Sequence, residues 1–260
     1  MNKALAKNIA ISSTSGFFIG FAAGLVGVGG GEFRLPILVG LLGFSIPIAA
    51  NINLIIGVLT VSVGLLRRLQ SGFLLPDIFD IIVAMCVGSI LGAYLGAWLT
   101  GKVKEKYLKI FLAVFLVILG IKLILKPYTH FELAFSPEFP LNIILGFVFG
   151  ALISIVSGSL GVAGGELRIP TFMYAFSIPI KQAGTASLLV SIPTVLAGTF
   201  KHLKMGHLNR EGKIICLAMG VPAAVGAFLG ASVLGMVSDE ILKLLLGIIL
   251  LAATVRVIKP

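Results

Sequence analysis

Charge is scarce in this sequence. Only 12% of the 260 residues are Asp, Glu, Lys or Arg, against roughly a quarter in an ordinary soluble domain, whereas 58% are hydrophobic. This composition excludes an ordinary soluble domain and predicts a protein whose solvent is the lipid bilayer. Twenty Lys and Arg stand against ten Asp and Glu, but no basic cluster is interleaved with aromatic residues, so we expect no nucleic-acid partner.

Residues that bind metals or act as nucleophiles are equally rare. The two cysteines, Cys86 and Cys216, lie inside apolar runs without a CxxC spacing, and there are only three histidines. We therefore expect no disulfide, no metal site and no cofactor. The sequence also lacks a nucleophile elbow and a Walker lysine after its glycines. These absences argue against an enzyme and exclude an ATP-driven pump.

The chain contains an internal repeat. At an offset of 134 positions, the string GGEFRLP of residues 30–36 returns as GGELRIP in residues 164–170. We predict two related halves, residues 1–126 and 141–260, joined by a proline-rich aqueous loop over residues 127–140. The apolar N-terminal stretch recurs in the second half, so we interpret it as part of the repeat and not as a signal peptide.

Each half contains five apolar segments. The third to fifth are long enough to cross a bilayer, the second is about half a span, and Ser12–Ser15 interrupt the first. We expect an all-α polytopic membrane protein of two inverted-topology repeats, in which glycine loops join broken or re-entrant helices that meet near mid-membrane. The segments cover residues 9–28, 34–45, 48–66, 78–99 and 106–125, then 141–160, 168–178, 183–200, 213–235 and 241–258.

The crossings and the basic residues predict an orientation. Three crossings after each hairpin put the ends of a half on opposite sides, so the second half is inverted. The side that holds the N-terminus receives twelve Lys and Arg and the other side six, with Arg34 and Arg168 set aside as intramembrane residues. Because Lys and Arg accumulate in cytoplasmic loops, we expect a multi-pass inner (plasma) membrane protein with both termini in the cytoplasm.

Glycines at a spacing of four residues predict close packing between helices. Gly88, Gly92 and Gly96 lie on one face of the fourth segment, and Gly226 and Gly230 lie on its counterpart. Small residues at this spacing let two helix backbones approach closely, which matters in lipid because no hydrophobic drive holds helices together there. We interpret these glycines as packing residues.

The two glycine-rich strings form the predicted functional centre. Glycine can adopt positive φ and turn several N–H groups toward one point, and we expect helices to start at Pro36 and Pro170 with their positive dipole ends at the same place. An anion-binding site is the chemistry that this arrangement supports. The predicted backbone donors are Gly29, Gly30, Gly31, Gly164 and Gly165.

Arg34 and Arg168 are the predicted charged ligands of that anion. An arginine inside a bilayer costs about 2.5–3.5 kcal/mol on insertion scales, so one in each half indicates a partner or a ligand. A guanidinium can donate two parallel hydrogen bonds to an oxyanion or a carboxylate. Glu32 and Glu166 are predicted to gate the site or couple it to protons. A structural alternative stays open, in which Glu32 neutralises Arg168 and Glu166 neutralises Arg34.

Polar residues in the third segment of each half extend the predicted site. Asn51 and Asn53 in the first half align roughly with residues 183 and 185 in the second. Their side chains, with those of Thr185 and Ser187, can complete the coordination of an oxyanion. Hydrogen bonding between helices is an equally weighted alternative for these residues.

These residues carry a family resemblance. The run GLVGVGGG of residues 24–31, followed by PIL at Pro36 and repeated over residues 158–170, resembles the sulfite exporter TauE/SafE family of membrane permeases. The strings GTASL of residues 184–188 and HLKMGH of residues 202–207 are similar to the later pattern of that family, whereas Asn51 and Asn53 stand where a Thr-Ser pair is more usual. The resemblance implies a carrier for sulfite, sulfoacetate or related C2 sulfonates, powered by an ion gradient.

We therefore expect a secondary transporter that works by alternating access around a central anion site. Its expected partners are a small anion, the lipid bilayer and protons as a candidate coupling ion. The alternatives are a passive anion channel, a transporter of another small organic anion, a non-transporting membrane scaffold and an intramembrane enzyme.

Overall fold

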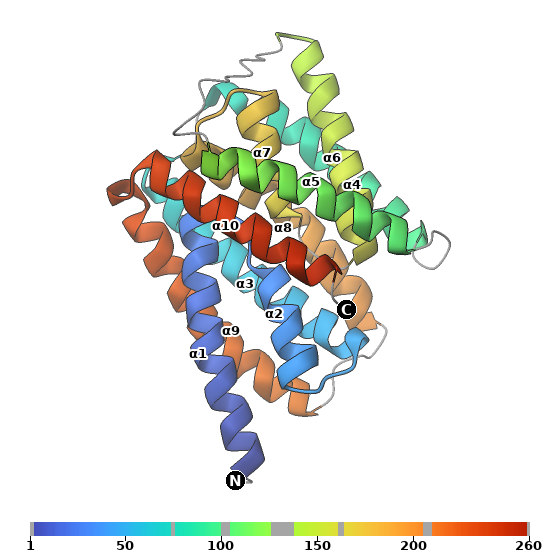
Figure 1. Cartoon of the computed structure of the whole chain (residues 1–260), viewed down its shortest axis with the longest axis vertical. Coiled ribbons are helices and arrows are strands. Elements are labelled where there is room, and N and C mark those ends of the chain that lie inside the picture. The colour runs from blue at the N-terminus through green and yellow to red at the C-terminus, as the bar shows by residue number, and fades with distance from the viewer. Residues whose placement is uncertain are drawn as a thin grey trace.

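The computed structural model describes residues 3–73, 76–99, 105–125, 138–160, 164–204 and 210–258, and the described chain forms ten α-helices (Figure 1). Each of the ten expected apolar segments is helical, which confirms the all-α class for this part of the chain. Residues 127–137 of the predicted linker lie outside the described residues. The helices are α1 (Lys3–Val26), α2 (Gly31–Pro36), α3 (Ile46–Gln70), α4 (Phe79–Leu99), α5 (Glu105–Leu125), α6 (Leu141–Leu160), α7 (Gly165–Ala175), α8 (Ile180–Lys204), α9 (Arg210–Val233) and α10 (Asp239–Ile258).

The first helix is continuous through the residues that were expected to interrupt it. The hydroxyls of Ser13, Thr14 and Ser15 do not break α1 because they bond to carbonyls along or across helices. Thr14 Oγ1 donates to the carbonyl of Ala10 at 2.9 Å, and Ser13 Oγ donates to the carbonyl of Ala218 in α9 at 2.9 Å. The interruption predicted at these residues is therefore wrong, and of the first two segments only α2 is short.

The short helices begin earlier than the sequence predicted. α2 starts at Gly31 and α7 at Gly165, so Pro36 and Pro170 lie inside helices and not in a first turn. In each case a glycine with positive φ directly precedes the helix and ends the loop there. Pro36 has no N–H to continue the α-helical ladder, and the chain after it forms a π-helical turn, Ile37–Leu41.

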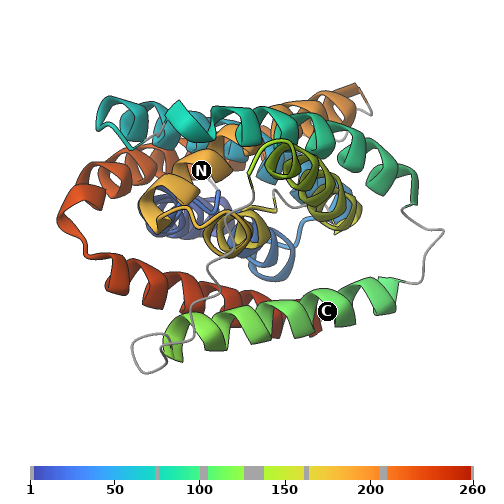
Figure 2. The same cartoon turned by 90° about the horizontal axis from the view of Figure 1, so that it is seen from above.

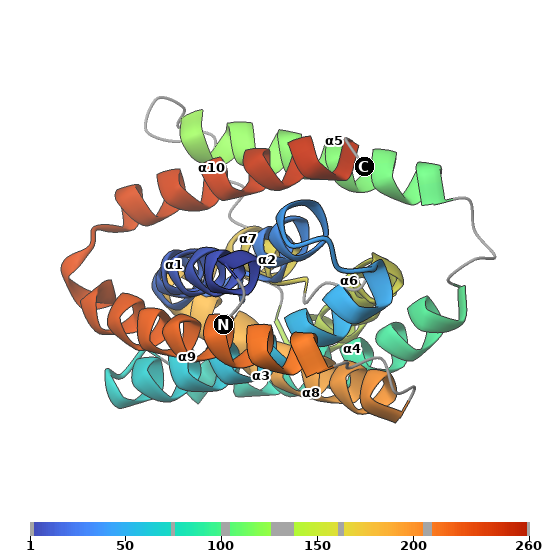
Figure 3. The ribbon, with the colours of Figure 1, turned by 90° about the horizontal axis from the view of Figure 1, so that it is seen from below.

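The helices form three layers. Seen from above and from below, α1, α2, α6 and α7 lie in the middle, α9, α3, α8 and α4 form a row on one side, and α5 and α10 lie side by side on the other (Figures 2 and 3). One buried apolar cluster joins the outer pair to the middle layer and includes Leu123 of α5, Leu246 of α10 and Phe172 of α7. The glycine loops thus belong to the enclosed layer.

Two helix pairs make the closest contacts, α1 with α9 and α4 with α6. A Cβ atom placed on Gly92 of α4 would collide with the backbone of Ala151 in α6, and one on Gly226 of α9 would collide with the backbone of Phe17 in α1. The packing role predicted for these glycines is therefore confirmed. Each pair joins a helix of the first predicted half to one of the second.

Five of the described helices contain apolar stretches long enough to cross a membrane, judged by length and composition. The described residues of α5 and α6 contain shorter apolar stretches. That α5 and α10 cross the membrane stays a prediction. The five long stretches are Leu5–Val26, Ile48–Gln70, Phe79–Gly96, Ile180–Phe200 and Arg210–Met236.

Candidate functional site

The two glycine loops meet in the interior. Gly30 before α2 and Gly164 before α7 adopt left-handed backbone conformations, with φ of 76° and 74°, which residues with a side chain rarely adopt. A Cβ atom on Gly165 would collide with the backbone of Val28 in the other loop. The predicted contact between the two tips is therefore present, and their depth in a membrane stays a prediction.

Arg34 is almost fully buried, with 1% of its surface exposed, and it connects α2 to α3. Its Nε donates to Oδ1 of Asn53 at 3.0 Å, its Nη1 to Oγ1 of Thr60 at 3.2 Å, and its Nη2 to the carbonyl of Gly29 at 2.9 Å. All three acceptors are neutral, so the positive charge keeps no carboxylate partner within hydrogen-bonding distance among the described residues. The predicted site residues Asn53 and Gly29 hold the arginine in place.

Arg168 is also buried and connects α7 to α8 and α6. Its Nη1 donates to Oγ of Ser191 at 3.0 Å and its Nη2 to Oγ of Ser154 at 3.1 Å. Sequence reasoning missed both serines, and it missed Thr60. A periodicity signal existed for two of the three, because Ser191 lies one helical turn after Ser187 and Thr60 lies two turns after Asn53.

Glu32 and Glu166 are buried in the first turns of α2 and α7 and face each other. Their carboxyl groups lie within hydrogen-bonding contact, and Glu166 also accepts a bond from its own backbone N–H. Neither oxygen of Glu32 accepts a hydrogen bond from any described residue. The predicted crosswise bridge from Glu166 to Arg34 is absent from the described contacts, because Arg34 donates to neutral groups and the glutamate contacts its counterpart instead.

Two further predicted ligands are buried without hydrogen-bond partners in the described chain. They are the side-chain amide of Asn51 and the hydroxyl of Ser187, both 0% exposed. A buried polar group without a partner costs free energy, so most such groups in proteins are satisfied by a partner, a water or a ligand. Gly31, another predicted ligand, lies next to Asn53, because a Cβ atom on Gly31 would be 3.0 Å from Nδ2 of Asn53.

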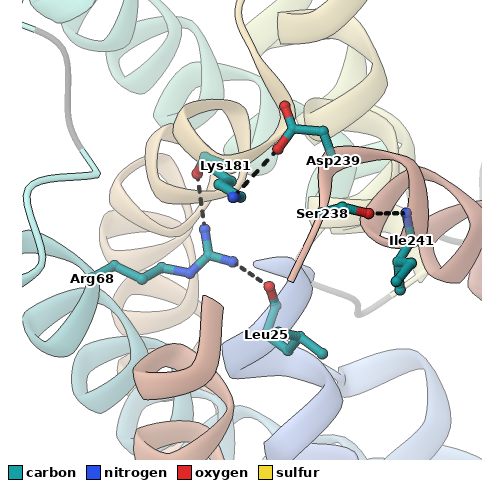
Figure 4. A network of polar contacts seen from close by, with 6 residues as sticks. All are labelled: Leu25, Arg68, Lys181, Ser238, Asp239 and Ile241. Atoms are coloured by element: carbon teal, nitrogen blue, oxygen red, sulfur yellow. Dashed lines mark hydrogen bonds and ion pairs between the residues drawn. The ribbon is translucent and has the colours of Figure 1, made fainter. Parts of the chain in front are cut away.

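Sequence reasoning assigned a third arginine to a loop, and the structure buries it. Arg68 at the end of α3 is 0% exposed. Its Nε and Nη2 donate to the carbonyls of Gly24 and Leu25 at 2.9 and 2.8 Å, and its Nη1 donates to the carbonyl of Lys181 at 3.1 Å and to Oγ1 of Thr185 at 3.3 Å. Figure 4 shows the bonds to Leu25 and Lys181. Thr185, which the sequence predicted as an anion ligand, therefore accepts a hydrogen bond from Arg68 and not from Arg168.

The Arg68 network joins four helices at one end of the molecule. Its carbonyl acceptors are at the end of α1 and the start of α8, and Lys181 of α8 also pairs with Asp239 of α10 at 3.5 Å (Figure 4). A positive side chain suits the C-terminal end of α1, where the helix dipole is negative. The sequence carried no signal for this role, because Arg67 and Arg68 are adjacent and only the tertiary contacts distinguish them.

Replacing Arg68 by methionine is expected to lower the free energy of unfolding by about 3 kcal/mol, because four buried acceptors lose their donors. Denaturant unfolding of the purified protein in detergent measures the effect. R67M is the matched control, since Arg67 is only half-buried and donates a single bond, to Ser232 at 2.8 Å. Equal stability of the two variants would contradict the role of Arg68.

Comparison with known proteins places these features in one family. The profile described as sulfite exporter TauE/SafE matches residues 2–123 and 145–260. The chain is 28% identical over 126 residues to the probable membrane transporter protein YunE of Bacillus subtilis, covering 48% of this chain and 42% of that protein. It is 35% identical over 135 residues to the probable membrane transporter protein MJ0441 of Methanocaldococcus jannaschii, covering 49% and 48%. Each match thus spans less than half of the relative. No solved structure matches.

Proposed function

Because the chain belongs to the sulfite exporter TauE/SafE family of multi-pass membrane transporters, which are not enzymes, we propose that it carries small sulfur oxyanions, such as sulfite or C2 sulfonates. The carrier is a secondary transporter, driven by an ion gradient, that exposes a central anion site alternately to the two sides of the membrane.

The observation that carries this proposal is the pair of buried arginines on the two short helices. Arg34 and Arg168 are buried at equivalent positions of two short helices whose preceding loops touch each other. The hydrogen bonds described for both run to neutral groups. The three hydrogen bonds of Arg34 leave two of its five N–H groups for an oxyanion, for which a guanidinium is a suitable donor.

The remaining proposed ligands are buried polar groups and backbone N–H groups. The amide of Asn51 and the hydroxyl of Ser187 supply buried polar groups that no described residue satisfies. The backbone of the loops supplies N–H groups at the start of α7, an eleven-residue helix whose dipole favours an anion. Asn53 and Gly29 contribute by holding Arg34.

Two inverted halves, residues 1–126 and 141–260 with the linker 127–140, are part of the proposal. The helix pairs support it, because α1 contacts α9 as α6 contacts α4, so the first helix of each half contacts the fourth helix of the other. In such an architecture the halves rock about a site at their interface. We also propose cytoplasmic termini. Arg68 is buried, so the side opposite the N-terminus has five Lys and Arg in place of six. The side of the N-terminus still has twelve, so the excess that indicates the cytoplasmic side remains.

A thermal-shift screen of the purified protein in detergent tests the substrate class. Sulfite and C2 sulfonates are expected to raise the melting temperature in a concentration-dependent manner, because a ligand that binds only the folded state stabilises it. Carboxylates of the same size are the control. A comparable shift with carboxylates would remove the sulfur specificity, and no shift with any anion would remove the anion site.

Transport against a gradient tests the carrier itself. Proteoliposomes with an imposed proton gradient are expected to accumulate the sulfonate above its external concentration. Equilibration without accumulation would indicate a passive channel with the same site.

A further inference from the structure

The contact between Glu32 and Glu166 joins the two predicted halves through a pair of acidic groups. Their side chains are 4% and 2% exposed, and their carboxyl groups are in hydrogen-bonding contact. Both oxygens of Glu32 and Oε2 of Glu166 receive no hydrogen bond from any described residue. The two groups therefore face each other with three unsatisfied oxygens and no described donor between them.

Two ionised carboxylates cannot form this contact favourably. Each ionised group only accepts hydrogen bonds, and two like charges repel strongly away from water. A proton between them supplies the missing donor and removes one of the two charges, as in other carboxyl pairs that share a proton. We propose that Glu32 and Glu166 bind one shared proton, and that this proton is the coupling ion of the transport cycle. The proposal rests on the transport function proposed above.

The charged and titratable groups around the pair define its charge balance. Arg34 interacts electrostatically with Glu32 and with the thiol of Cys216. Arg168 interacts with both glutamates and with the thiol of Cys86. Both cysteines are free thiols and contribute no charge when protonated. Among the residues that the structure describes, the charged groups that interact with the pair are therefore the two arginines.

A single shared proton sets the charge of the anion that moves with it. One monovalent anion, such as bisulfite or a monosulfonate, balances the charge of one proton. The cycle then moves one proton with one monovalent anion and no net charge.

The same proton controls the contact between the loops. Gly165 of one loop lies directly against the backbone of Val28 in the other, so there is little space in which the carboxyl groups could separate locally. Loss of the proton leaves two adjacent negative charges that push the starts of α2 and α7 apart. Deprotonation on one side of the membrane thus opens the region between the loops and releases the anion, which couples the two movements.

Proton counting in proteoliposomes tests the stoichiometry. Ethanesulfonate is the probe, a pH dye is enclosed in the vesicles, and potassium with valinomycin sets the membrane potential. We expect one proton to enter with each ethanesulfonate and a rate that does not change with the potential. Uptake without proton entry, or a rate that follows the potential, would overturn the proposal.

The double variant E32Q/E166Q tests the residues. Neutral amides cannot take up a proton, so we expect proton entry to be lost while ethanesulfonate still shifts the melting temperature. E240Q is the matched control, because Glu240 is an exposed carboxylate at the start of α10, and it is expected to keep one proton per anion. Retained proton entry in the double variant would contradict the assignment.

Infrared spectroscopy of the detergent-purified protein separates this proposal from the transport function. A protonated carboxyl group gives a C=O stretching band of its own, which we expect in the unsubstituted protein and in E240Q and not in E32Q/E166Q. The measurement requires no substrate, so it decides the shared proton even if no anion binds. Absence of that band from the unsubstituted protein at neutral pH would refute the shared proton.

Discussion

Replacing Arg34 by glutamine is expected to lower the affinity for a C2 sulfonate about 100-fold, and R168Q is expected to do the same. A hydrogen bond to a charged group contributes about 1.5 kcal/mol or more, so losing two such bonds to one oxyanion costs about 3 kcal/mol. Every 1.4 kcal/mol corresponds to about tenfold in affinity, which gives this magnitude. Titration of the melting temperature with the sulfonate, together with uptake into proteoliposomes, measures the effect.

Glutamine is the appropriate replacement because it removes the charge and keeps one amide donor. In R34Q the amide nitrogen stands at the position of Nε and can still donate to Asn53, so we expect the helices to remain in place. R67Q is the control, since Arg67 lies near the end of α3, donates to Ser232 and leaves both short helices untouched. Wild-type affinity in both R34Q and R168Q would refute the site assignment.

Replacing Gly92 by valine is expected to cost about 3 kcal/mol of stability, because it places a branched side chain where the α4 and α6 backbones touch. A Cβ at this position would collide with the carbonyl of Ala151, which cannot move without shifting α6. In lipid the two helices depend on this close approach, so separating them removes contacts along their whole length. Loss of helical circular dichroism on heating in detergent measures the change.

Gly40→Ala is the matched control for that prediction. Gly40 lies in the π-helical turn, and a Cβ placed on it meets no atom within 4 Å. We expect this variant to unfold at the same temperature as the unsubstituted protein. If G92V were as stable as G40A, the close contact between α4 and α6 would not support the fold.

The helices could be predicted from the sequence because local patterns determine them. Apolar runs between charged or Gly/Pro positions indicated all ten helices, since a segment in lipid must satisfy its backbone hydrogen bonds internally. The exact start of α2 and α7 could not be predicted in the same way. The proline suggested a first turn, but the start depends on a positive φ at Gly30 and Gly164, which the loop geometry decides.

The site could be predicted only in part. The repeated strings indicated Arg34, Arg168 and the two glutamates as residues with a common purpose, because charge inside an apolar run is costly. Hydroxyl partners such as Thr60 and Ser191 were missed because serine and threonine are common on helices that cross membranes. Their role depends on which face of α3 and α8 is turned toward the short helices.

The sequence by itself determined the solvent of this protein, its helices and the two glycine loops with their arginines, because each of these depends on neighbouring residues. Only the tertiary structure decided the partners of the charged groups. It buried Arg68 beside exposed or half-buried neighbours, and it brought the carboxyl groups of Glu32 and Glu166 together. The physical reason is that desolvation and hydrogen bonding at a buried charge depend on segments more than a hundred residues away, whose approach no local pattern encodes.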